Sequence, residues 1–239
     1  MANLIRTAKS GSDWTVHELA AYNIRVEPQD AATFFGTPVL PDPVLAPAEV
    51  LKAARAEQAS SDDGYLFLRT LELSLTRSRL LLTSRSSSSV LVVILELEEH
   101  TQTDVCIMDD NDEIRLLVQE DKRHMDGTDP EPQLIAEAIA ACAANNQTRV
   151  RTLSLPPPLY KVMPGITLTG TTPAFYKTPV SNDLVVAVQG CVYPQQETVV
   201  RVHIPALPRP ARRWSEGMKP LDNRRIILSC YEAFKQFVN

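Results

Sequence analysis

Two short apolar runs flank an acidic turn in the middle of the chain. Residues 105–108 (VCIM) and 114–118 (IRLLV) are each of strand length, and the tetrapeptide 109–112 (DDND) between them is rich in turn-forming residues. The pattern predicts an antiparallel hairpin. Both faces of these strands carry apolar residues, which is typical of strands in the middle of a sheet that is covered on both sides.

A strongly periodic segment follows the hairpin. Residues 130–144 carry apolar side chains at helical spacing, and Pro130 stands at the first helical position, where proline is favoured. We therefore expect a helix that packs on the sheet. We expect it to end at Asn145-Asn146, because asparagine adopts the C-cap conformation more readily than most residues.

The rest of the chain alternates between helical and strand patterns. The expected helices are 14–22, 48–59, 65–75 (helical or mixed), 183–192 and 221–238, and the expected strands are 90–98, 149–155, 166–171, 174–177 and 198–204. This order predicts an α/β fold with a mixed central β-sheet flanked by helices. We expect residues 1–60 to form a helical, proline-containing extension and residues 61–239 to form the main domain.

Composition narrows the class of protein. A hydrophobic content of 44% over 239 residues suffices for a sizeable core, and there is no apolar run of membrane-spanning length or apolar leader at the start. The four cysteines lie far apart without a C-x-x-C spacing, which argues against structural zinc and for reduced thiols in an intracellular protein, cytoplasmic or nuclear. The sequence does not indicate an oligomeric state.

The hairpin brings acidic residues toward one another. If the turn is centred near residues 111–112, Asp104 lies opposite, or nearly opposite, Glu120, with Cβ atoms roughly 4.5–5.5 Å apart. Because strand residues two apart share a face, Glu120 and Lys122 are expected on one side together with Asp104. The other residues expected on that side are Ile114, Leu116, Val118, Cys106 and Met108. The polar end of an apolar face needs a counter-charge, which a divalent cation or Lys122 would supply.

These residues resemble the PD-(D/E)XK nuclease-like superfamily and, more closely, a group of largely uncharacterised fungal proteins that carry this core. The resemblance rests on TDVCI (103–107), LLVQEDKRH (116–124), DPEPQLIAEAIAA (129–141), PGITLTGTTPAFYK (164–177) and EGMKPLDNRRIIL (216–228). Together these stretches span roughly the last 135 residues. The implied fold is a restriction-endonuclease-like core, and the implied activity is metal-dependent phosphodiester hydrolysis.

The resemblance also implies a role for each site residue. Asp104 takes the place of the Asp of the PD element, although Thr103 stands where the proline gives the motif its name. Glu120 and Lys122 form the (D/E)xK pair, and Gln133 falls where some branches keep a glutamine near the site. Asp104 and Glu120 would bind Mg²⁺ (or Mn²⁺), which prefers oxygen ligands and keeps several waters.

Basic and aromatic residues outside the motif are candidates for contact with nucleic acid. His124 lies near the expected site, and the loop 205–219 contains Arg212, Arg213 and Trp214, a combination that tracks phosphates and stacks bases. The alternative is that this loop is an exposed proline-rich connector. The net charge of −5 is unusual for an enzyme of nucleic acids, although it does not exclude one.

The sequence leaves three readings of function. The first is a Mg²⁺-dependent nuclease-like hydrolase, and the second is a catalytically inactive interaction or nucleic-acid-binding module with the same fold. The third is a binding protein for a small phosphorylated ligand. Each site residue also has a simpler structural interpretation. Residues 120–123 could be a solvated strand end, Asp104 could cap the hairpin, and Gln133 could be an ordinary polar residue in the first turn of a helix.

Overall fold

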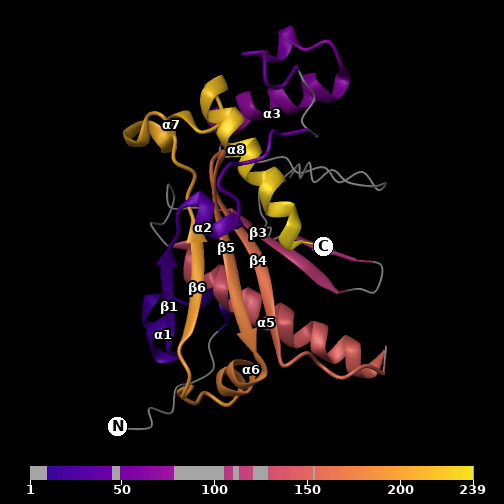
Figure 1. The fold of residues 1–239 in the computed structure, drawn as a ribbon, viewed down its shortest axis with the longest axis vertical. Helices are drawn as coiled ribbons and strands as arrows, with labels where there is room; N and C mark the ends of the chain where they lie inside the picture. The colour runs from indigo at the N-terminus through magenta and orange to yellow at the C-terminus, as the bar shows by residue number, and fades with distance from the viewer. Residues whose placement is uncertain are drawn as a thin grey trace.

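The described part of the chain folds around one mixed β-sheet. The computed structural model describes residues 10–44, 49–77, 105–109, 113–120, 129–152 and 154–238. Within these residues, six strands are ordered β1-β6-β5-β4-β3-β2 (Figure 1). The strands are β1 (Ile24–Pro28), β2 (Val105–Met108), β3 (Ile114–Glu120), β4 (Tyr160–Thr169), β5 (Thr172–Ser181) and β6 (Thr198–His203). The pairing pattern means that β1, β3, β4 and β6 run in one direction, opposite to β2 and β5.

Helices cover both faces of this sheet. The helices are α1 (Val16–Ala21), α2 (Ala31–Phe35), α3 (Asp62–Arg77), α5 (Pro130–Arg151), α6 (Asn182–Gln189), α7 (Arg213–Glu216) and α8 (Leu221–Phe234), with short 3-10 turns at Gly11–Asp13, Ala56–Gln58, Pro210–Arg212 and Lys235–Phe237. One apolar cluster joins α1, α5 and α6 to one face, and a second joins α2 and α8 to the other (Figure 1). The expected α/β fold with a mixed sheet flanked by helices is therefore confirmed.

Helix α5 lies unusually close to the sheet. A Cβ atom added to Gly165 of β4 would lie 3.0 Å from Cδ2 of Leu134, so this glycine makes room for the helix. The apolar stripe predicted for this helix is buried, with Leu134 and Ile135 fully inaccessible to solvent. The contact fixes α5 against the β3–β4 pair.

The predicted end of this helix is wrong. Helix α5 continues to Arg151, so the strand expected at 149–155 does not form and Arg149–Arg151 make up the last helical turn. Asn145 does not cap the helix, because its side-chain amide is used elsewhere: it accepts a hydrogen bond from Ile114 N (2.7 Å) and donates one to Ile114 O (2.9 Å). A tertiary contact thus replaces the expected local cap.

The N-terminal part of the chain contributes to the sheet. Residues 24–28, expected within a helical extension, form strand β1, which pairs in parallel with β6. The prediction of a helix at 48–59 is wrong for the described residues of that range, which form only the 3-10 turn Ala56–Gln58. Helix α2 was not predicted. The first helix starts at Val16, two residues later than expected, because Thr15 caps it: Thr15 N donates to Glu18 Oε2 at 2.9 Å.

The elements predicted for the C-terminal part are confirmed with changed ends. The two short strands expected at 166–171 and 174–177 belong to one long hairpin, β4–β5. The expected helix and strand at 183–192 and 198–204 appear as α6 and β6, and the closing helix appears as α8 with a 3-10 turn after it. The strand expected at 90–98 lies outside the described residues.

A buried arginine joins the N-terminal segment to α8. Arg224 is 1% exposed and donates hydrogen bonds to the backbone carbonyls of Val50, Ala53, Met218 and Lys219. Burial lowers the pKa of its guanidinium to about 10, so the group remains charged at neutral pH. Four backbone acceptors therefore depend on one side chain for their hydrogen bonds.

We predict that Arg224→Met lowers the free energy of unfolding by roughly 3–5 kcal/mol, because the carbonyl groups that it serves are left buried without donors. Urea unfolding followed by circular dichroism measures the change. Arg225→Met is the matched control, since the neighbouring Arg225 is exposed and, among the described residues, its ion pair is a 3.5 Å contact with Asp42. Equal losses for the two variants would contradict a specific role for Arg224.

Candidate functional site at the carboxyl end of β3

The predicted hairpin forms, in a register that differs by one residue from direct opposition of Asp104 and Glu120. In the described ladder Val105 pairs with Val118 and Ile107 with Leu116, and a bulge follows between Ile107 and Met108. Asp104, Lys122 and His124 lie outside the described residues. Their roles remain predictions.

The faces assigned to the first strand of the hairpin were wrong. Ile107, not Cys106, shares a face with Leu116 and Val118, and these three residues pack in the cluster beneath α8. Cys106 pairs with Leu117, which faces α5. The register therefore places Val105, Cys106 and Ile107 on the faces opposite the expected ones, whereas Met108, beyond the bulge, pairs with Ile114 as expected. Counting residues outward from the turn placed Asp104 on the same face as Glu120. The observed pairing of residues 105–107 does not support that placement.

Only the second strand of the hairpin is internal within the described sheet. Strand β3 is paired on both sides, and its residues Leu116, Leu117 and Val118 are all buried. Strand β2 lies at the edge of the described strands, which leaves Cys106 and Met108 exposed. The expectation of a buried central strand therefore holds for β3 alone.

Glu120 is the last residue of β3, where several elements meet. Its backbone pairs with Leu168 near the end of β4. Helix α5 begins at the same end: the Tyr176 side chain hydrogen-bonds with Glu131 of its first turn and with Thr167, the residue paired with Gln119. The end of an internal strand and the start of a long helix thus come together here.

Gln133 lies on α5 one half-turn beyond Glu131. It is half-buried, and its Nε2 donates to Glu137 Oε1 at 3.0 Å. The turn that carries Gln133 is therefore at the Glu120 end of the sheet, as the short connection from β3 to α5 led us to expect. Its role in the site stays a prediction.

A buried polar row lines the sheet beside the start of α5. Gln119, Thr167 and Thr169 are 3%, 4% and 6% exposed, and Gln119 Oε1 has no hydrogen-bond partner among the described residues. Burial, followed by the charge of Glu131, raises the pKa of Tyr176 above its ordinary value. Electrostatic interactions at this place are strong, because little water screens them.

Gln119 was missed as a candidate by the sequence argument. The signal was present, since Gln119 is the first polar residue after three consecutive apolar ones in an otherwise buried strand. The site was instead sought at the charged residue next to it. An unpaired buried amide oxygen in a native fold calls for an explanation.

The residues at this end fit a hard divalent cation. The potential ligands on the α5 side of this end are oxygen atoms: the amide of Gln119 and the carboxylates of Glu131 and Glu137. Magnesium prefers such oxygen ligands, and one of its bound waters would satisfy an acceptor like Gln119 Oε1. Among the described side chains, which do not include that of Glu120, no group of three or more His, Cys, Asp or Glu is placed to hold a metal by itself.

The basic loop predicted to contact nucleic acid reaches the same end of the sheet. Thr172, at the start of β5, donates its hydroxyl to the carbonyl oxygen of Arg213 at 2.8 Å. Arg212 is exposed and lies 3.7 Å from Glu216, and the Arg213 guanidinium lies 4.8 Å from the ring centre of Trp214. The loop is folded into two short helical turns, so it is more ordered than an exposed connector.

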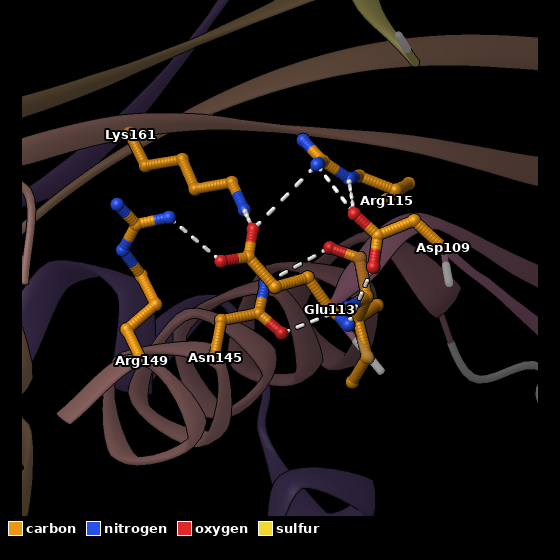
Figure 2. A network of polar contacts seen from close by, with 7 residues as sticks. Asp109, Glu113, Arg115, Asn145, Arg149 and Lys161 are labelled. Atoms are coloured by element: carbon orange, nitrogen blue, oxygen red, sulfur yellow. Dashed lines mark hydrogen bonds and ion pairs between the residues drawn. The ribbon is translucent and has the colours of Figure 1, made fainter. Parts of the chain in front are cut away.

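A separate ionic network lies at the opposite end of β3. The Glu113 side chain is 4% exposed and is surrounded by three cations: Arg149 Nη1 at 2.8 Å, Lys161 Nζ at 3.3 Å and Arg115 Nη2 at 3.8 Å (Figure 2). Asp109 pairs with Arg115, and Asn145 binds the adjacent strand backbone. Every charged member has a partner, which indicates a structural network rather than a binding site.

Comparison with known proteins found no match, either to a protein family, to a curated protein or to a solved structure. In the part of the chain that the structure describes, no helix has the length and apolarity needed to cross a membrane.

The Glu113 network predicts a pH dependence of stability. Burial alone would raise the pKa of Glu113, but hydrogen bonds from Arg149 and Lys161 outweigh it and lower the pKa below its ordinary value. A carboxyl with a lowered folded-state pKa stabilises the fold fully above its unfolded pKa of about 4.3 and loses that contribution as the pH falls through the folded value. Glu113→Gln should therefore lose roughly 2–4 kcal/mol at pH 6 and progressively less below pH 4.

Thermal and urea unfolding across this pH range measures the effect. Glu197→Gln is the control, since Glu197 forms an exposed ion pair with Arg25 at 3.1 Å. A constant difference between wild type and Glu113→Gln at every pH would show that the carboxylate charge is not what stabilises the network.

Proposed function

We propose that this protein is a Mg²⁺-dependent, nuclease-like hydrolase that cleaves phosphodiester bonds of nucleic acids at the carboxyl end of β3. The observation that carries the proposal is the position of Glu120. It is the last residue of an internal strand, at the end of the sheet where α5 begins, and the residue before it, Gln119, lies on the α5 face with a buried amide oxygen that has no partner among the described residues.

The arrangement of the surrounding elements supports this assignment. The (D/E)xK reading requires a hairpin whose second strand leads into a helix, and β2, β3 and α5 follow one another in that order. The connection from β3 to α5 is residues 121–129, and Lys122 stands in it two residues after Glu120. Strand β4 then returns parallel to β3 and brings Thr167 and Thr169 to the same end.

Each residue has a proposed task. Glu120 and Asp104 would hold the cation, a pairing taken from the superfamily resemblance and not from the hairpin register; Lys122 would orient the attacking water and offset the charge that develops on the phosphate. Gln133, on the first turns of α5, contributes an amide to the polar end. Bound Mg²⁺ would polarise the phosphoryl oxygen and lower the pKa of a coordinated water.

We predict that Glu120→Gln or Asp104→Asn abolishes metal-dependent cleavage, because a single carboxylate holds Mg²⁺ poorly against its hydration shell. Lys122→Ala should keep metal binding and reduce the cleavage rate by roughly 10²–10³-fold, which is the range for loss of one preorganised charged group. Lys122→Arg should rescue only in part, since a planar guanidinium does not replace a compact ammonium. Cleavage of mixed single- and double-stranded DNA and RNA, with calorimetry of Mg²⁺ and Mn²⁺ binding, provides the measurements.

Asp183→Asn is the matched control for the loss of a carboxylate. Asp183 is exposed in the first turn of α6, which follows the carboxyl end of β5 and so lies at the other end of the sheet. It should retain full activity. Wild-type cleavage that persists in EDTA would rule out the metal mechanism, and a wild type that neither binds metal nor cleaves any of these nucleic acids would instead support the inactive interaction module.

Gln119 gives an independent prediction about the same site. Replacing a buried amide whose oxygen is unpaired by an apolar group of similar length removes that unpaired acceptor, so Gln119→Met should leave the free energy of unfolding unchanged or raise it by about 1 kcal/mol. If the amide oxygen serves the metal or its waters, the same variant should lose metal affinity. Thermal unfolding with and without Mg²⁺ measures both quantities. A destabilised variant with unaltered metal affinity would assign Gln119 to the fold alone.

A further inference from the structure

One arginine near the site differs from the other arginines of its segment. Arg209 donates to Glu216 Oε2 at 2.6 Å and to both carboxylate oxygens of Asp222 at 2.8 and 2.7 Å. Arg212 has its ion pair with Glu216, and Arg224 has its four carbonyl acceptors. Arg209 and Arg224 are thus fully bonded to partners within the fold, and Arg212 is exposed to solvent with a single ion pair at 3.7 Å.

The Arg213 side chain has no such partner among the described residues. Its Nε and Nη2 atoms are buried and form no hydrogen bond, and burial lowers the pKa of its guanidinium, with no acidic group opposing that effect. Leaving charged donors buried and unpaired is costly, and a guanidinium fits the oxygens of a carboxylate or phosphate as a planar fork. These donors fit an anionic ligand.

The backbone of Arg213 is held firmly while its side chain is not. The Arg213 carbonyl oxygen accepts hydrogen bonds from Thr172 Oγ1 at 2.8 Å and from Gly217 N at 2.9 Å. The side chain contacts the Trp214 ring, which is 45% exposed. Turning the guanidinium toward an incoming anion therefore breaks no hydrogen bond and gives up only a cation–π contact.

The position relates this arginine to the proposed site. Thr172 pairs with Thr169 across the β4–β5 turn, and Leu168 pairs with Glu120. Strand β5 is two strand spacings from β3, roughly 10 Å, a separation that one or two nucleotides of a strand can span. One strand can therefore reach both places.

We infer that Arg213 binds a backbone phosphate of a nucleic-acid strand, close along the strand to the bond that is cleaved, with Trp214 beside it as a face on which a base stacks. The ligand chemistry is a phosphate oxyanion, and the exposed indole favours a nucleic acid over free phosphate. The inference rests on the proposed function for the identity of the strand as a substrate. Arg213 is a positioning residue, since it holds the strand and does not touch the reacting atoms.

The test is binding of a fluorescein-labelled, short single-stranded oligodeoxynucleotide in EDTA, measured by anisotropy, so that catalysis plays no part. Arg213→Ala should weaken binding roughly 10–100-fold, the range for charge-assisted hydrogen bonds to a phosphate. Arg213→Lys should recover part of the loss, because it keeps the charge without the fork. Arg212→Ala, which removes the same charge one residue away, should change binding less than about threefold.

A second arm separates the two sources of phosphate. Inorganic phosphate is titrated while the emission of Trp214 is followed against a Trp214→Phe control, because withdrawal of the guanidinium from the indole alters its emission. The oligonucleotide should produce the emission change at a far lower concentration than inorganic phosphate. A change that inorganic phosphate produces equally well would overturn the assignment to a nucleic-acid strand.

The remaining outcomes separate this inference from the proposed function. Equal losses for Arg212→Ala and Arg213→Ala, or no binding by wild type, would overturn the Arg213 site even if Glu120-dependent cleavage is found. Binding that depends on Arg213 without any Mg²⁺-dependent cleavage would retain the site and reject the hydrolase. If both Arg213-dependent binding and Mg²⁺-dependent cleavage are found, Arg213→Ala should raise KM about tenfold or more and leave kcat nearly unchanged, since the lost contact holds the substrate equally in the ground state and the transition state. A fall in kcat alone would contradict the positioning role.

Discussion

The buried carboxylate of Glu113 is the constraint on which the β3–α5–β4 unit depends. An unpaired charge in this position would be prohibitively costly, so the fold must bring cations to it from separate elements. Arg149 comes from the last turn of α5 and Lys161 from the start of β4 (Figure 2). Because these partners are more than 30 residues away along the chain, the carboxylate is satisfied only when helix and strands are assembled.

This constraint also explains the length of α5. A helix that ended at Asn145 would leave Glu113 without Arg149 and would free the Asn145 amide from the strand backbone. The network and the close approach of Leu134 to Gly165 fix the two ends of α5 on the sheet. The first turn of α5 is consequently held in one position beside Glu120, and a preorganised site needs such support.

The two ends of β3 differ in how their polar groups are satisfied. At the Glu113 end, the carboxylates and cations pair with one another within the protein, although Arg149 Nε is buried without a hydrogen-bond partner among the described residues. At the Glu120 end, Gln119 Oε1 and two Arg213 nitrogens are buried without hydrogen-bond partners among the described residues. Natural folds tolerate unsatisfied groups mainly where they serve a ligand, so the second end is where we place function. The net charge of −5 is compatible with an anion-binding site at this end, since the local electrostatic potential, and not the net charge, decides where an anion binds.

The sequence by itself determined the elements whose signals are local. The period of the apolar residues predicted α5 and the two strands of the hairpin, and the acidic turn predicted their pairing. Three features could not be predicted in this way. The end of α5 depends on the contact of Asn145 with Ile114, and the place of β1 depends on its pairing with β6, so in both cases the partner is distant in the sequence. The register of β2 includes a bulge at Ile107/Met108, which the apolar pattern does not reveal. Glu120 could be proposed from the sequence because a charge at a strand end is visible there. Gln119 and Arg213 were recognisable as unsatisfied donors and acceptors only after the tertiary structure had assigned partners to the polar groups around them.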